Sequence, residues 1–153
     1  MTNEALQNLI GGWQADLEFT EAESQFLNIT VQPENLHTLM TELKQNQETS
    51  FDYMFCLSGV DWGKELGVVY HLESTKHRHV VVVKVKTEDR EKPTFDTVSN
   101  IWETAEFHER EVFDFFGIEF NNHPNLKRLF LTENWDGFPL RKDYEDEINM
   151  VIK

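Results

Sequence analysis

Hydrophobic residues near the start of the chain follow the 3.6-residue period of an amphipathic helix in two places. Residues 2–10 contain helix-forming residues with one apolar side, and Gly11-Gly12 ends this predicted helix. Pro33 suits the first turn of a second helix. The apolar positions that follow have the spacing i, i+3, i+4 and i+7, which predicts one buried side: Leu36, Leu39, Met40 and Leu43.

Four segments have the composition or alternation of β-strands. Residues 26–32 are rich in β-branched side chains, and residues 51–58 alternate apolar and polar positions before a predicted turn at 59–63. Residues 67–73 and 79–87 predict two further strands joined by a short connection. The last of these strands contains a run of valines that is apolar on both faces, which predicts a central place in the sheet.

The helical period returns over residues 97–116, where Gly117 is a fitting C-terminal cap. The predicted order is α-β-α-β-β-β-α, which is typical of an α+β layered domain with a mainly antiparallel sheet. Beyond the cap, residues 123–145 combine prolines, a glycine and aromatic residues without a sustained period. We therefore expect a single α+β domain over residues 1–120 and an extended, partner-binding C-terminal arm over residues 121–153.

The charge of the chain restricts its partners. Its 28 acidic and 14 basic residues give a formal net charge of −14, which predicts no nucleic-acid partner and disfavours anionic membrane surfaces. No segment approaches the roughly 20 apolar residues that span a bilayer, and the first residues lack the features of a signal peptide. We expect a soluble, cytosol-facing protein that reaches any membrane only through its partners.

The usual carriers of chemistry are missing from the sequence. Cys56 is the only cysteine, and its apolar neighbours predict an inert core residue. His77 and His79 are interpreted as surface residues beside a hairpin, because an ordinary zinc site needs three or four ligands. No glycine-rich loop has the spacing of a nucleotide-binding motif. The sequence thus predicts no catalytic residue, cofactor or metal on this chain.

The third predicted helix carries the most informative side chains. Glu109 falls in its apolar sector, where a carboxylate needs a partner because an unpaired buried charge is costly. We hypothesise that Glu109 or Glu111 accepts a hydrogen bond from Arg128 or Arg141, with a solvated Glu-Arg-Glu face as the alternative. An acid–base pair of Glu109 with Asp114 is a third possibility, although they lie on different faces. Three polar residues share the side opposite the apolar sector: Arg110, Glu111 and Asp114.

Two long motifs in this region resemble those of a known family. Residues 109–118 read Glu-Arg-Glu-x-x-Asp-Phe-Phe-Gly-Ile, followed by His123-Pro124 and then by Leu-Lys-Arg-Leu at 126–129. Residues 135–144 read Trp-Asp-Gly-Phe-Pro-Leu-Arg-Lys-Asp-Tyr. Together they closely resemble the C-subunit family of respiratory complex I, the thirty-kilodalton subunit family of NADH:quinone oxidoreductase. Phe107 is a departure, because we expect the family often to have Trp there.

The resemblance implies a non-catalytic structural subunit in the hydrophilic arm of a proton-translocating NADH:quinone oxidoreductase. It would lie on the cytoplasmic face of the membrane beside the B, D and I subunits, with FMN, iron–sulfur clusters and quinone on other subunits. Because the sequence ends soon after Tyr144, we expect a free-standing C-type protein rather than a fusion with the quinone-site D subunit. The residues expected to have structural or subunit-interface roles are Glu109, Arg110, Glu111, Asp114, Gly117, His123, Pro124, Arg128, Trp135, Gly137, Pro139, Leu140, Arg141, Lys142, Asp143 and Tyr144.

Three alternatives remain open at this point. The chain could be the equivalent subunit of a membrane-bound hydrogenase or of a quinone oxidoreductase with another electron donor. It could be a self-contained acidic enzyme that uses carboxylates such as Glu109 and Glu111, which requires a pocket with convergent groups. It could also be a small acidic binding module, which would have a stable partner outside any redox complex.

Overall fold

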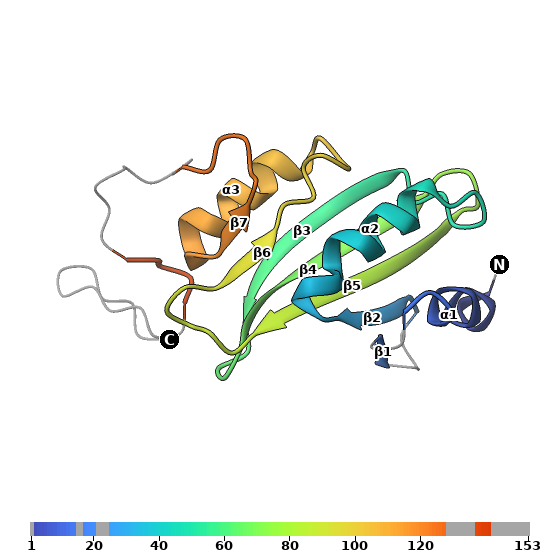
Figure 1. Cartoon of the computed structure of the whole chain (residues 1–153), viewed down its shortest axis with the longest axis horizontal. Coiled ribbons are helices and arrows are strands. Elements are labelled where there is room, and N and C mark those ends of the chain that lie inside the picture. Colours follow the sequence, from blue (N-terminus) through green and yellow to red (C-terminus); the bar gives the residue numbers. More distant parts are fainter. Residues whose placement is uncertain (1, 15–16, 21–24, 128–136, 142–153) are drawn as a thin grey trace.

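A computed structural model describes residues 2–14, 17–20, 25–127 and 137–141 of the 153-residue chain. Figure 1 shows a five-stranded sheet with α2 packed on it and α3 beside β3. None of the helices in these ranges has the length and apolar character needed to cross a bilayer. In chain order the elements are α1 (Asn3–Gly11), β1 (Glu18–Thr20), β2 (Leu27–Val31), the 3-10 turn η1 (Pro33–Asn35), α2 (Leu36–Gln45), β3 (Tyr53–Asp61), β4 (Leu66–Ser74), β5 (His79–Thr87), β6 (Thr94–Asp96), α3 (Ala105–Phe116) and β7 (Glu119–Asn121).

The main sheet has the strand order β1-β2-β5-β4-β3 and is antiparallel except where β2 and β5 pair in parallel. The predicted central place of β5 is confirmed, and its valines explain it because Val81 and Val83 are buried on one face and Val82 on the other. β6 and β7 form a separate two-stranded parallel sheet. The predicted α+β fold with a mainly antiparallel sheet is therefore confirmed.

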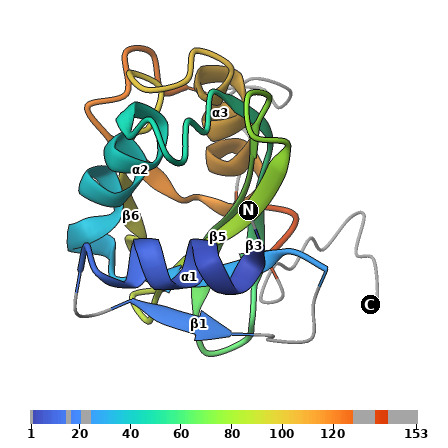
Figure 2. The same ribbon diagram turned by 90° about the vertical axis from the view of Figure 1, so that its right-hand side faces the viewer.

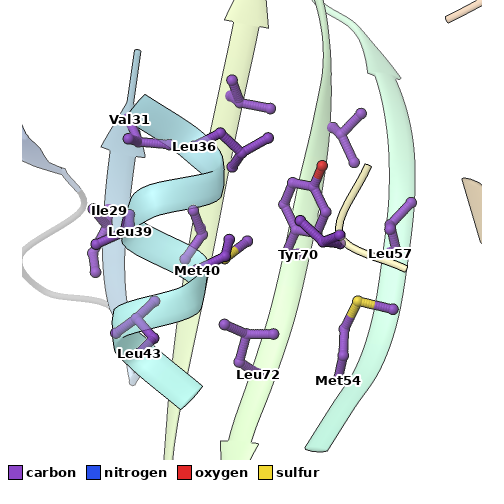
Figure 3. Close-up of a cluster of buried hydrophobic side chains, with 14 of the residues drawn as sticks. Ile29, Val31, Leu36, Leu39, Met40, Leu43, Met54, Leu57, Tyr70 and Leu72 are labelled. Atoms are coloured by element: carbon purple, nitrogen blue, oxygen red, sulfur yellow. The ribbon is translucent and has the colours of Figure 1, made fainter. Parts of the chain in front are cut away.

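The core lies between α2 and one face of the sheet. All four residues of the predicted apolar side of α2 are fully buried, and Figure 3 shows them with side chains of β2, β3 and β4. Burying one such aliphatic side chain contributes about 1.5–3 kcal/mol. Helix α1 lies against β1 and β2 (Figure 2), and it adds Leu6 and Ile10 to the same core. The helices predicted at both of these positions are confirmed.

β3 ends later than the alternation of residues 51–58 predicts. It continues to Asp61, so residues 59–61 belong to the strand rather than to a turn. The buried Asp61 carboxylate accepts hydrogen bonds at 2.8 Å from both terminal nitrogens of Arg90 and at 2.8 Å from the Gly63 N–H. This bidentate pair fixes the chain reversal after Asp61, and the sequence does not bring the two partners close together.

α3 begins later than the period of residues 97–116 predicts. Isolated turns precede it, with hydrogen bonds from Ile101 N to Val98 O (3.0 Å) and from Ala105 N to Trp102 O (3.0 Å). The indole N–H of Trp102 donates to the Phe51 carbonyl at 3.1 Å and anchors these turns to the core. The prediction of a helix over residues 97–104 was wrong because consecutive turns give a similar hydrophobic spacing without a continuous helix.

Candidate functional site: the surface of helix α3

Helix α3 lies along β3, the edge strand of the main sheet (Figure 1). At its start, the Thr104 hydroxyl donates a hydrogen bond to the Met54 carbonyl at 3.3 Å. At its end, the ring of Phe116 covers Gly59, where a Cβ atom would lie 2.6 Å from the ring. The helix can approach the strand this closely because position 59 has no side chain. Ala105 and Val112 are buried on the inner side of the helix.

Glu109 projects from the inner side of α3 and holds the chain that leads into the helix. Its carboxylate accepts hydrogen bonds from the Thr97 hydroxyl and, at 2.9 Å, from the Val98 backbone N–H. The side chain is completely buried. Burial raises the pKa of Glu109 to about 7, although the two hydrogen bonds act in the opposite direction. A carboxyl group that titrates near neutral pH is therefore enclosed in the structure.

Thr97 can pair with Glu109 in either protonation state. A hydroxyl group has one proton and can also accept hydrogen bonds. When Glu109 is ionised, Thr97 donates to it. When Glu109 is protonated, it can donate to the Thr97 oxygen, which then donates to the Ser99 hydroxyl 2.7 Å away. The Val98 N–H keeps a carboxyl oxygen as its acceptor in both states.

The hypothesised ion pair of a helix carboxylate with Arg141 was wrong, and the alternative pair with Arg128 stays a prediction. The partners of Glu109 are a hydroxyl, a backbone amide and His123, whose Nε2 lies 3.8 Å from a carboxyl oxygen. Arg141 binds a backbone carbonyl instead, and Arg128 lies outside the described residues. Glu111 is exposed, so it does not converge with the buried Glu109 on a common substrate position.

Arg110 and Asp114 are buried although the helical period places them opposite the apolar sector. Both side chains have polar or charged partners. The Nε atom of Arg110 donates to the Lys127 carbonyl at 3.4 Å, which is a long hydrogen bond. The side of α3 opposite the apolar sector is therefore partly covered by the chain that follows β7.

His123 fastens the chain after β7 to the first turns of α3. Its Nδ1 accepts a hydrogen bond from the Asn125 N–H at 2.9 Å, and its Nε2 lies 3.0 Å from the Glu106 carbonyl. Because a carbonyl only accepts, Nε2 donates this hydrogen bond. Pro124, next in the chain, is exposed.

The C-terminal end of α3 is capped by the segment 137–141. Gly117 has φ 75°, and its N–H donates to the Phe113 carbonyl at 2.9 Å. Two further carbonyls of the last turn accept hydrogen bonds from this segment: Phe115 from the Leu140 N–H (3.0 Å) and Phe116 from Nε of Arg141 (2.6 Å). A cation at this end also opposes the partial negative charge of the helix dipole. The predicted cap at Gly117 is confirmed.

Phe138 packs where Gly117 leaves room. A Cβ atom at position 117 would lie 2.6 Å from the Phe138 ring. The same ring lies 6.2 Å from the ring of Phe113 and 5.5 Å from the guanidinium carbon of Arg141. Gly117 therefore has two roles, because it allows the left-handed backbone that ends the helix and it admits an aromatic side chain of the segment 137–141.

The predicted site residues fall into three groups. One group meets on or near α3: Glu109, Arg110, Asp114, Gly117, His123, Gly137, Pro139, Leu140 and Arg141. Glu111 and Pro124 are exposed. The third group lies outside the described residues: Arg128, Trp135, Lys142, Asp143 and Tyr144. Sequence reasoning missed Thr97 and the Val98 N–H as the partners of Glu109, because both fell inside a predicted helix.

Cys56 and His79 differ from their predicted environments. Cys56 is half-buried, with Sγ 3.4 Å from the Ser58 hydroxyl, so it is not a core residue. His79 is buried, with its ring 4.9 Å from that of Phe51 and 5.6 Å from that of His77. Over the residues described, no group of three or more His, Cys, Asp or Glu side chains could hold a metal.

The enclosed Glu109 carboxyl predicts a pH dependence of stability. Its pKa is about 7 in the folded protein and near the ordinary 4.5 in the unfolded chain, so the folded protein binds more protons between these values. The contribution of Glu109 to the free energy of unfolding therefore decreases as the pH rises from about 4.5 to about 7, by at most about 1.4 kcal/mol per pH unit. Urea unfolding at several pH values, with Glu109→Gln subtracted as the non-titrating reference, measures this contribution. If the difference in free energy of unfolding between the wild type and Glu109→Gln does not change with pH, the prediction is contradicted.

Comparison with known proteins identifies the family. The family model described as "Respiratory-chain NADH dehydrogenase, 30 Kd subunit" matches residues 29–148. The chain belongs to this family. Over 122 residues it is 50% identical to the C/D subunit of the NADH-quinone oxidoreductase of Phocaeicola vulgatus, covering 79% of this chain and 23% of that protein. The chain thus spans about a quarter of the length of the C/D relatives it matches.

Relatives that are named as the C subunit alone match as well. The one from Chloroherpeton thalassium is 46% identical over 105 residues, which is 67% of this chain and 43% of that protein. The second C-type protein of Rhizobium meliloti is 35% identical over 152 residues, which is 94% of this chain and 82% of that protein. This chain also resembles a chain in the structure of an archaeal membrane-bound sulfane sulfur reductase. The two chains have a TM-score of 0.79 and 25% identity, with 95% of this chain and 86% of that chain covered.

Proposed function

We propose that this chain is a non-catalytic structural subunit in the hydrophilic arm of a proton-translocating NADH:quinone oxidoreductase. In this role it supports electron transfer from NADH to quinone by holding the quinone-side module together. The chain belongs to the family, and the observation that carries the proposal is the way its helix α3 holds the surrounding chain. One helix organises the chain before it through Glu109, the chain after it through His123, and the segment 137–141 through its last carbonyls.

The chemistry of the chain is consistent with this role. The titratable groups at α3 serve the chain itself, since Glu109 binds Thr97 and Val98, and His123 is bound to backbone atoms. We therefore place FMN, the iron–sulfur clusters and quinone on other subunits. The proposed partners are the B, D and I subunits, and the proposed location is the cytoplasmic face of the membrane, with attachment through the complex.

Deletion of residues 135–153 tests this role. It removes Phe138, Leu140 and Arg141, and leaves the last carbonyls of α3 to water, which costs about 1–3 kcal/mol. We expect the truncated chain to fold with a lowered melting temperature and to be lost from the complex when membranes are solubilised and a tagged chain is purified. The full-length tagged chain is the control. Recovery of the truncated chain with the other subunits at the control level would refute the proposal.

A second candidate is the equivalent subunit of a respiratory complex with another electron donor. A chain of an archaeal sulfane sulfur reductase resembles this chain over 95% of its length. This likeness supports the second candidate, because the same fold occurs in a respiratory membrane complex that is named for another reaction. Membranes with and without this chain distinguish the two candidates. Loss of NADH-driven quinone reduction on its removal supports the first candidate, whereas loss of activity only with another donor supports the second.

A further inference from the structure

The large exposed hydrophobic residues of the described ranges lie on elements that pack against one another. The four large hydrophobic side chains that are exposed there are Phe107 (59%), Tyr53 (47%), Leu140 (45%) and Phe55 (38%). They belong to β3, to α3, and to the segment 137–141 that caps α3. Single exposed apolar residues are ordinary on protein surfaces, but a cluster on adjacent elements marks an interaction surface.

Contacts between β3 and α3 bring the elements that carry these residues together. The hydrogen bond from Thr104 to the Met54 carbonyl places the start of α3 against the part of the β3 backbone that lies between Tyr53 and Phe55. Phe107 follows Thr104 by three residues, about one helical turn farther along the exposed part of α3. Farther along, a groove of about 220 Å³ lies between the two elements and is lined in part by Ser58, Glu111 and Leu140. We define the α3–β3 seam as Tyr53, Phe55, Phe107, Glu111, Phe115 and Leu140.

The charged residues of α3 and of the turn before it are mostly acidic. Glu111 and Glu103 are exposed, and Glu106 is half-buried one residue before Phe107. Of the cations nearby, Arg110 is buried, with its guanidinium carbon 5.8 Å from the Phe107 ring, and it donates to the Lys127 carbonyl. Arg141 donates to the Phe116 carbonyl. The surface therefore combines apolar side chains with carboxylates, in a chain whose formal net charge is −14.

We propose that the α3–β3 seam is a docking surface for a neighbouring protein subunit that presents an apolar pocket flanked by Lys or Arg side chains. This inference rests on the proposed function and adds a surface of the folded domain to the interface expected from the C-terminal arm. Charge complementarity selects this partner, because carboxylates around apolar anchors match cations around a pocket. The same carboxylates would repel nucleic acid or an anionic lipid surface.

Two substitutions in the full-length chain test the seam. Phe107→Ser removes its most exposed aromatic ring, and Glu111→Lys reverses the charge within it. We expect each variant, tagged and purified from solubilised membranes, to retain about one tenth or less of the partner subunits that the wild type retains. Glu34→Lys in η1 is the matched control, because it makes the same charge change at an exposed residue outside the seam. It should purify with the wild-type amount of partners.

Salt and thermal melting separate docking from folding. Phe107 and Glu111 are exposed, so both variants should melt within a few degrees of the wild type. Rising salt should release partners from the wild type more steeply than from Glu111→Gln, because screening weakens the charge attraction. If both seam variants purify with the wild-type amount of partner subunits, the seam is not a docking surface, and the proposed function still stands. Failure of the wild-type chain to purify with any oxidoreductase subunit would overturn both.

Discussion

Replacing Glu109 with alanine is expected to lower the free energy of unfolding by about 2–4 kcal/mol at neutral pH. The substitution leaves the buried Val98 N–H without its acceptor, a loss that costs about 1–3 kcal/mol, and it opens a space in a fully buried position. Removal of a carboxyl whose ionisation is opposed by burial offsets part of this cost. Urea unfolding followed by far-UV circular dichroism measures the change.

Glu109→Gln is the matched control for this prediction. Its side-chain oxygen can still accept from the Val98 N–H, and its amide can donate to the Thr97 oxygen, as the protonated carboxyl does. We expect a change of less than about 1 kcal/mol at neutral pH. If glutamine destabilises the protein as much as alanine does, the negative charge rather than the hydrogen-bond geometry holds the chain at Thr97.

Replacing Gly117 with alanine is expected to destabilise the protein by about 3 kcal/mol and to displace the segment 137–141 from α3. A non-glycine residue at φ 75° costs about 1–2 kcal/mol in backbone strain. The added Cβ atom would also lie 2.6 Å from the Phe138 ring, and such overpacking costs about 1–3 kcal/mol. Thermal unfolding measures the stability, and hydrogen exchange at Leu140 reports whether the segment remains docked.

Gly63 provides the control for the steric part of this effect. It has φ 95°, but a Cβ atom there would meet no atom within 4 Å. Gly63→Ala should therefore show the backbone strain without the clash, at about 1–2 kcal/mol. Gly117→Ala should destabilise the protein more than Gly63→Ala does, because of the clash with Phe138. Adding Phe138→Ala to Gly117→Ala should recover part of this extra destabilisation. Equal effects of the two glycine substitutions would mean that contact with Phe138 does not stabilise the cap.

The long elements could be predicted from the sequence because each has many residues in one period. The apolar side of α2 and the doubly buried valines of β5 are read directly from the spacing, and the structure confirms both. β1, β6 and β7 were missed because a strand of three residues is too short to establish a period. Such strands depend on neighbours that are distant in sequence, as Phe95 of β6 pairs with Phe120 of β7.

The candidate site was predicted in its location but not in its contacts. The motif and the apolar sector identified Glu109 as a buried group that needs a partner, and it is buried and partnered. Arg141 was one of two expected partners, but it binds the Phe116 carbonyl, and the described donors to Glu109 are the Thr97 hydroxyl and the Val98 N–H. Periodicity describes an isolated helix, so it placed Arg110 and Asp114 opposite the apolar sector and could not show that they are buried. The chain that returns after β7 covers part of that side, and this return is a tertiary feature without a local signal.

The parallel pairing of β2 with β5 has a consequence for the order of folding. Val31 pairs with Val85, and α2, β3 and β4 lie between the two strands in the chain. β3, β4 and β5, by contrast, are consecutive antiparallel neighbours joined by short turns, so they can form a meander from local contacts alone. Closing the longer loop costs more chain entropy, and contacts of large sequence separation form more slowly. We therefore expect the meander to assemble first and β2 to join its open edge afterwards, so that a nascent chain exposes the edge of β5 until its N-terminal part docks.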